Sequence, residues 1–407
     1  MGLDISAHPI DTALFRDRLI PFVQGQGALD DLIERAVALA AVRHRANSWG
    51  LGAYNVQSAF TDAQSEASPK VVHQYERPVS QPSLIGRLFG AKAKTVTESY
   101  EAPERVPGLP GFDTDLAIWG RPFFIVADDE VTALADFERY LALAGQGEAA
   151  VDVLGQEMIA RMEAMRTRLP ADAHPAVLAA ARAFPPFPQV AQADGESRFS
   201  AARTERALRK QIETLRDIYA ARGTTKTFDI EDGESEDEEG GERWVRVDTG
   251  SDPLPSPTAN ELLPGLPHGI VGFASALLPG WMNRGSNHAS HLLDMIGIKT
   301  RDLIETPEPL FAPLVKAERR VGEALRSTIH DNFSLGGYVP PEKVAAFVET
   351  LEKHKHELSR AWYPDEAADF ISSDFIKIIE PARYAMKHGF GYLEAAEVYS
   401  APLGVMN

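Results

Sequence analysis

The chain has 407 residues, of which 44% are hydrophobic and 25% charged, and its formal net charge at pH 7 is -18. This composition is typical of a globular protein long enough for two domains, and the negative charge disfavours nucleic acid as a partner. The absence of cysteine excludes disulfides, thiolate metal sites, iron–sulfur clusters and cysteine nucleophiles.

Two stretches of the sequence bear on its location. The N-terminal stretch carries Asp4 and Asp11 and lacks the apolar core of a secretory signal. The longest nearly uncharged apolar stretch, residues 269–281, is interrupted by Gly and Pro and is too short to cross a bilayer. We therefore expect a cytoplasmic protein without a transmembrane segment.

The first predicted element is a helix over residues 28–46. Its apolar residues recur at helical spacing, with acids near the start and arginines near the end, as the helix dipole favours. Residues 47–122 follow as an irregular insertion rich in Gly, Pro, Ser and Gln. Within it, residues 71–78 and 95–103 alternate polar and apolar side chains and each ends on Pro. This pattern predicts the two arms of one hairpin.

The stretch between these arms, residues 83–94, is a candidate interaction segment. It sets apolar side chains, including Leu84, Ile85 and Phe89, against three basic residues. Three uses fit this pattern: a mobile loop, docking of a protein partner, and peripheral membrane contact. The segment is short and contains two glycines, which favours the mobile loop and disfavours membrane contact.

Helical periodicity returns over residues 128–145, 148–168 and 197–223, which predicts three further helices. The first runs from an Asp cap to a terminal Gly. The third is locally basic, because seven Arg and Lys residues outnumber three Asp and Glu residues.

Residues 229–242, just after the basic helix, read DIEDGESEDEEGGE and hold nine carboxylates and no cation. They do not fit an EF-hand, because starts at Asp229, Asp232 or Glu234 place no Gly at position six. Uncompensated carboxylates repel one another and resist burial, so we expect an exposed acidic loop. Its carboxylates are candidate contacts to a basic partner, represented by Asp232, Glu236 and Glu238.

The five prolines of residues 251–269 exclude a long helix or a central strand there, and more helices are expected beyond them. Their predicted bounds are 286–297, 308–329, 340–362 and 364–388, the last ending at Gly389 and interrupted by Pro381.

These elements predict a predominantly helical α+β fold with a small N-terminal hairpin or sheet. We expect a mainly helical N-terminal unit over 1–227, with the hairpin insertion at 47–122. An exposed connector over 228–268, acidic and then Pro-rich, leads to a helical C-terminal unit over 269–407.

The sequence lacks the common catalytic signatures GxxxxGK[ST], GxSxG, HExxH and a helix-opening GxGxxG. One weak metal candidate remains, in which His288, His291 and Asp294 share a side of a predicted helix. The alternative is a capped, partly buried helix start, because Ser286 or Asn287 is a natural cap. We favour the cap, since no further ligand converges from the sequence.

Three other residues are catalytic candidates. Arg284 precedes the same helix and suits an anion-binding role. Asp365 and Asp369 are spaced as a carboxylate pair for acid–base work, although acids in a first helical turn also serve to offset the helix dipole.

The leading prediction is a cytoplasmic protein-interaction module that neutralises or regulates a basic protein partner, in the manner of an immunity or antitoxin protein. The alternative is an enzyme with a dispersed site, such as a metal-dependent hydrolase or a phosphate-binding enzyme. The sequence identifies no cofactor and no oligomeric state.

Overall fold

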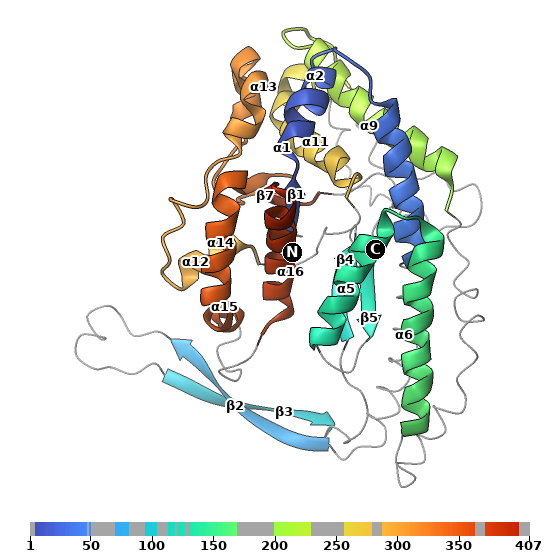
Figure 1. Cartoon of the computed structure of the whole chain (residues 1–407). Coiled ribbons are helices and arrows are strands. Elements are labelled where there is room, and N and C mark those ends of the chain that lie inside the picture. The colour runs from blue at the N-terminus through green and yellow to red at the C-terminus, as the bar shows by residue number, and fades with distance from the viewer. Residues whose placement is uncertain are drawn as a thin grey trace, which may run out of the picture.

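A computed structural model of the chain describes residues 5–46, 49, 70–80, 94–103, 113–118, 121–126, 130–168, 199–228, 256–278, 287–362 and 371–398. These residues are predominantly helical and include small antiparallel sheets, which confirms the predicted α+β class (Figure 1).

The elements of the first half follow the chain in this order: β1 (Ile5–Ile10), α1 (Thr12–Leu14), a π-helical turn (Phe15–Leu19), α2 (Ile20–Val23), a helix over residues 30–46, β2 (Lys70–Ser80), β3 (Lys94–Pro103), β4 (Asp113–Ile118), β5 (Arg121–Val126), α5 (Glu130–Ala144) and α6 (Glu148–Arg168). The helical elements of the second half are α9 (Ala201–Ala220), α10 (Ala259–Leu262), α11 (Leu266–Ser275), α12 (Ala289–Met295), α13 (Ala312–Ala317), α14 (Pro341–Lys353), α15 (Lys355–Trp362) and α16 (Ser373–His388), with 3-10 turns at Leu263–Gly265, Glu308–Phe311 and Arg319–Gly322. Its strands are β6 (Leu335–Val339) and β7 (Gly391–Ala396).

The central sheet joins the first strand of the chain to the last. Its strand order is β1-β7-β6, all antiparallel, with Ile5 opposite Ala396 and Ile10 opposite Gly391. None of these three strands was predicted, and the C-terminal part is therefore not purely helical. The sheet also connects the predicted units 1–227 and 269–407 directly; the division into domains stays a prediction.

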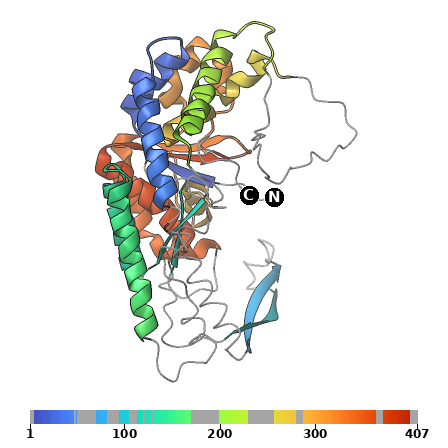
Figure 2. The same ribbon diagram turned by 90° about the vertical axis from the view of Figure 1, so that its right-hand side faces the viewer.

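Strand β7 separates two hydrophobic cores, because successive side chains of a strand point to opposite faces. Leu393 and Ala395 belong to a core shared with α9, α11 and the helix at 30–46. Tyr392 belongs to the other, shared with α12, α14 and α16. Figure 2 shows the sheet between these two groups of helices. Glu394 has the same strand parity as Tyr392, which directs it to the α12 side.

A buried arginine fastens the helix at 30–46 to the end of α11. Arg43 is 1% exposed, and its Nη1 donates to the carbonyl oxygens of Ala276 at 3.2 Å and Leu278 at 2.6 Å. A cation at these C-terminal carbonyls suits the helix dipole. Burial lowers the pKa of Arg43 to about 9, so the guanidinium still carries its charge at neutral pH.

Several predicted helices agree with the structure to within a few residues, among them α5, α6, α9 and α12. The predicted helix at 340–362 divides at His354 into α14 and α15. Helix α16 contains Pro381 and ends at Gly389, whose φ of 68° is a left-handed conformation that suits glycine. Residues 364–370, the predicted start of this last helix, lie outside the described residues.

Two expectations differ from the structure. The long helix predicted at 308–329 is replaced by α13 and two 3-10 turns, because Pro309 and Pro313 lack the N–H groups a continuous helix requires. The last part of the predicted exposed connector, from residue 259, packs its apolar side chains into the core: Leu263 and Leu266 are both 0% exposed. Prolines at helix starts, where the N–H is not needed, allow short helices here.

The predicted hairpin is confirmed by β2 and β3, which pair antiparallel from Lys70 opposite Pro103 to Ser80 opposite Lys94. In both views it lies apart from the central sheet (Figures 1 and 2). Among the described residues, no helix is both long enough and apolar enough to span a membrane.

Candidate functional site

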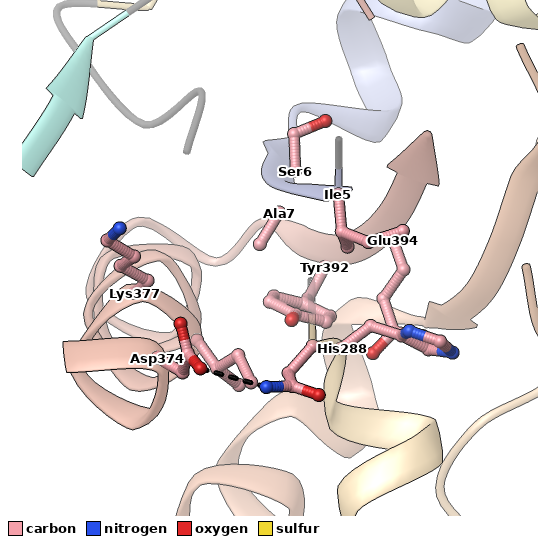
Figure 3. Close-up of a pocket in the computed structure, with 10 residues that line it drawn as sticks. Ile5, Ser6, Ala7, His288, Asp374, Lys377, Tyr392 and Glu394 are labelled. Carbon is pink, nitrogen blue, oxygen red and sulfur yellow. Dashed lines mark hydrogen bonds between the residues drawn. The ribbon is translucent and has the colours of Figure 1, made fainter. Parts of the chain in front are cut away.

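The candidate site is a small polar pocket where the central sheet meets α12 and α16 (Figure 3). Strands β1 and β7 supply one side, α16 another, and the start of α12 the third. The lining residues are Ile5, Ser6, Ala7, Asn287, His288, Asp374, Lys377, Ile378, Tyr392 and Glu394. The space inside is about 10 Å³, room for about one water molecule.

Glu394 organises this region although it is only 1% exposed. Its two carboxylate oxygens accept from the backbone N–H of Ser290 at 3.0 Å and from the Ser290 hydroxyl at 2.6 Å. These donors belong to the first turn of α12, whose N–H groups have no partner within the helix. A side chain from β7 therefore fixes where α12 begins, and the donors stabilise the buried carboxylate.

Glycine at position 337 leaves room for this carboxylate. A Cβ at Gly337 would lie 3.0 Å from Glu394 Oε2 and 2.5 Å from Ile304 Cγ2. The second distance is shorter than real carbon contacts allow. The close approach of β6 to Glu394 thus requires a residue without a side chain.

His288 precedes α12 and is the sequence candidate that the structure places in the pocket (Figure 3). A hydrogen bond of 3.2 Å joins its Nε2 to Thr328 Oγ1, whereas its buried Nδ1 has no hydrogen-bond partner. Burial lowers the pKa of His288 and the charge of Glu394 opposes this, so the imidazole is neutral at pH 7.

Thr328 links the imidazole to the carboxylate. The Ser290 hydroxyl lies 3.5 Å from Thr328 Oγ1, at the limit of a hydrogen bond, and donates more closely to Glu394. The result is a row of polar groups running from His288 through Thr328 and Ser290 to Glu394. Such a row holds the imidazole in a fixed orientation beside the pocket.

Two further lining residues complete the polar wall. Asn287 is 5% exposed, and its Nδ2 donates to Asp374 Oδ2 at 2.8 Å, which fixes the amide orientation and leaves Oδ1 as an acceptor. Tyr392 is 1% exposed and its ring packs against Phe347, with ring centroids 5.0 Å apart. Burial raises the pKa of Tyr392 well above its usual value, so its hydroxyl keeps its proton.

A second buried polar cluster lies next to the pocket on β1. A hydrogen bond of 2.7 Å joins Ser6 Oγ to His8 Nε2, and His268 Nε2 donates to the Ala396 carbonyl at 2.9 Å. Burial, followed by repulsion from His268, lowers the pKa of His8 to about 3. Both β1 and β7 therefore carry polar side chains into the interior.

The predicted metal ligands are only partly brought together. The rings of His288 and His291 stack with centroids 5.5 Å apart, while the side chains of His291 and Asp294 are exposed. Within the described ranges, no three His, Asp or Glu residues are grouped so as to hold a metal ion. Metal binding stays a prediction.

The remaining predicted site residues lie outside the described residues: Leu84, Ile85, Phe89, Asp232, Glu236, Glu238, Arg284, Asp365 and Asp369. Conversely, sequence reasoning missed Ser290, Thr328, Tyr392 and Glu394. One signal was available for Glu394, which stands alone as an acid in the apolar run GYLEAA at 391–396. A single charge in such a run marks a buried position that needs partners.

Comparison with protein-family models, with curated proteins and with solved structures gives no significant match for this chain.

Proposed function

We propose that the protein binds a basic protein partner through the acidic segment 229–242 and neutralises or regulates it, in the manner of an immunity or antitoxin protein. The observation that carries this proposal is the concentration of charge: nine carboxylates without a cation, against a formal net charge of -18 for the whole chain. Clustered like charges attract an oppositely charged protein over long range and accelerate its association.

The proposal is supported by the described residues that flank residues 229–255, the stretch that contains this segment. Thr227 and Thr258 form an antiparallel bridge. Backbone bonds of 2.9 Å run from Phe228 N to the Pro257 carbonyl and from Ala259 N to the Lys226 carbonyl. Lys226 and Thr227 are exposed, so these two flanks meet at one place on the surface.

Helix α9 ends shortly before the bridge between Thr227 and Thr258, and much of the polar face of α9 is exposed. Its seam residues Leu208 and Ile212 are 0% exposed, whereas Arg206 on the outer side is exposed. Arg209 is partly neutralised by Asp30, at 2.8 Å, and by Glu205. The basic face of α9 attracts the acidic segment as well. A basic partner must therefore compete with α9 for the carboxylates of 229–242.

The test compares two variants with the same change in net charge. One replaces all nine acids of 229–242 by Asn or Gln. The control neutralises nine exposed acids elsewhere: Glu34, Glu138, Glu148, Asp294, Asp302, Glu308, Glu323, Asp331 and Glu349. Each protein is purified from an extract of its native host at low and at high salt, and co-purifying proteins are identified and quantified.

We expect wild type and control to retain one basic protein in stoichiometric amount at low salt and to lose it at high salt. The variant of 229–242 should not retain it. Equal retention by both variants would refute a role for the segment, and a retained partner that ignores salt would refute the electrostatic mechanism.

A second candidate function is an enzyme with a dispersed site, such as a metal-dependent hydrolase or a phosphate-binding enzyme. The observation that favours it is the neutral His288 imidazole, held by Thr328 at the edge of the polar pocket. Metal analysis of the same purified protein tests the metal-dependent form. Near-stoichiometric zinc or manganese, lost in a His288→Ala and His291→Ala double variant, would favour the enzyme over the interaction module.

A further inference from the structure

Three buried polar atoms meet the same pocket without a hydrogen-bond partner. They are Asn287 Oδ1, His288 Nδ1 and Tyr392 Oη, and all three residues line the cavity. Buried polar atoms are nearly always paired, because an unpaired one destabilises the folded protein. Another such group, His356 Nδ1, Ser359 Oγ and Arg360 Nε, lies along α15. The three atoms around the pocket belong to residues that line one cavity, and this indicates a site built for a ligand.

The hydrogen-bonding capacity of these atoms defines the ligand. Asn287 Oδ1 can only accept, because the Asn287 amide nitrogen is fixed on Asp374. The Tyr392 hydroxyl keeps its proton and can donate it. His288 Nδ1 donates or accepts according to which ring nitrogen carries the hydrogen. The ligand therefore needs at least one hydrogen to donate and one lone pair to accept.

The size of the pocket narrows the ligand further. The space of about 10 Å³ admits about one heavy atom, so a larger ligand can place only a single atom, such as a hydroxyl oxygen, inside it. Ile5, Ala7 and Ile378 form apolar parts of the wall. Figure 3 shows Tyr392 between Asp374 on α16 and His288 on the opposite side, so the polar atoms come from different walls.

We propose that this pocket is a binding site for one hydroxyl group, which donates to Asn287 Oδ1, accepts from Tyr392 Oη and makes a third hydrogen bond with His288 Nδ1. Three hydrogen bonds are the usual number for a buried hydroxyl of this kind. The hydroxyl comes either from a water molecule or from the end of a small alcohol, which share this chemistry.

High-resolution crystallography of the full chain, grown without alcohols and then soaked in methanol, tests the proposal directly. We expect one density peak within hydrogen-bond distance, about 2.7–3.1 Å, of Asn287 Oδ1 and Tyr392 Oη. A single-atom peak in both crystals identifies a water site, and a peak extended by one atom in methanol identifies an alcohol site. A pocket without density in both crystals overturns the proposal.

A stability measurement provides an independent readout. Tyr392→Phe removes only the hydroxyl and keeps the ring that packs on Phe347. If the hydroxyl donates to a bound group, the folding equilibrium constant should fall roughly 5-fold. If it is unpaired, its removal should leave stability equal or higher, which contradicts the proposal. The matched control is Tyr140→Phe, since Tyr140 is equally buried and interacts electrostatically with Arg43.

Discussion

Two buried polar clusters lie against the central sheet, and they differ in what balances them. Around His8 the described polar partners are a hydroxyl, a carbonyl oxygen and a second imidazole. Around Ser290 the cluster is centred on the Glu394 carboxylate, which accepts from two donors of one helix start. The first cluster is buried only while its imidazoles are neutral. In the second, backbone and hydroxyl donors take the place of water around the buried carboxylate.

Removal of the Glu394 carboxylate should have the largest effect on the second cluster. Glu394→Ala leaves the Ser290 N–H and hydroxyl without their acceptor at the start of α12. Two hydrogen bonds to a charged group are worth about 3–6 kcal/mol together, so we expect a loss of that order in the free energy of unfolding. Urea unfolding measures it.

The control for this variant is Glu349→Ala, an exposed glutamate on α14, which should change stability by less than about 0.5 kcal/mol. Similar stabilities for the two variants would mean that Glu394 does not hold the helix start.

Gly337→Ala tests the same cluster from the side of β6. The added methyl group meets Ile304 and Glu394 at distances that force one of them to move. We expect a loss of about 1–3 kcal/mol, as is typical for overpacking. Gly265→Ala is the matched control, because nothing lies within 4 Å of a Cβ there. Equal melting temperatures for the two alanine variants would contradict the close packing.

The smallest expected effect is the pH dependence of stability that His8 contributes. The pKa of His8 is about 3 in the folded protein and about 6.5 when unfolded, so only the unfolded state binds the proton between these values. Stability is therefore full above pH 6.5 and falls as the pH drops, by about 1.5 kcal/mol between pH 6.5 and 5 from this group. Denaturant titrations at several pH values measure the slope.

His8→Gln keeps a side chain that can hydrogen-bond with Ser6 and removes the titrating group. The variant should lose less stability than wild type over the same pH interval. Identical pH slopes would show that His8 is not the group that responds.

The spacing of apolar residues was enough to predict many of the helices. It did not predict the strands of the central sheet, which pair with segments far away in the sequence. Helices α5 and α9 follow from apolar residues at helical spacing, and Gly145 follows the last residue of α5. The strands of the central sheet were not predicted, because β1 and β7 are buried along their whole length and have no exposed polar face by which to recognise them. The alternation of β1, from Ile5 to His8, is only four residues long.

Of the residues at the candidate site, the sequence identified only His288 as a candidate for chemistry. His288 was recognised because histidine suggests chemistry wherever it occurs. Glu394, more than a hundred residues away, acts only through a pairing that the sheet register creates. Thr328 and Tyr392 are ordinary residues until the fold brings Thr328 to His288 and Tyr392 to the pocket wall. Spacing along one helix cannot predict such a meeting.

The pairing of β1 with β7 has a consequence for synthesis on the ribosome. In the part of the chain that the structure describes, β1 is an edge strand that pairs with β7 alone, and β7 is translated more than 380 residues later. Until then the backbone groups of β1 lack their strand partner while the helices between them can already form. Closure of the central sheet is thus a late step, and such long-range pairing slows folding. Nascent chains stalled before Gly391 should be far more open to proteases than released ones.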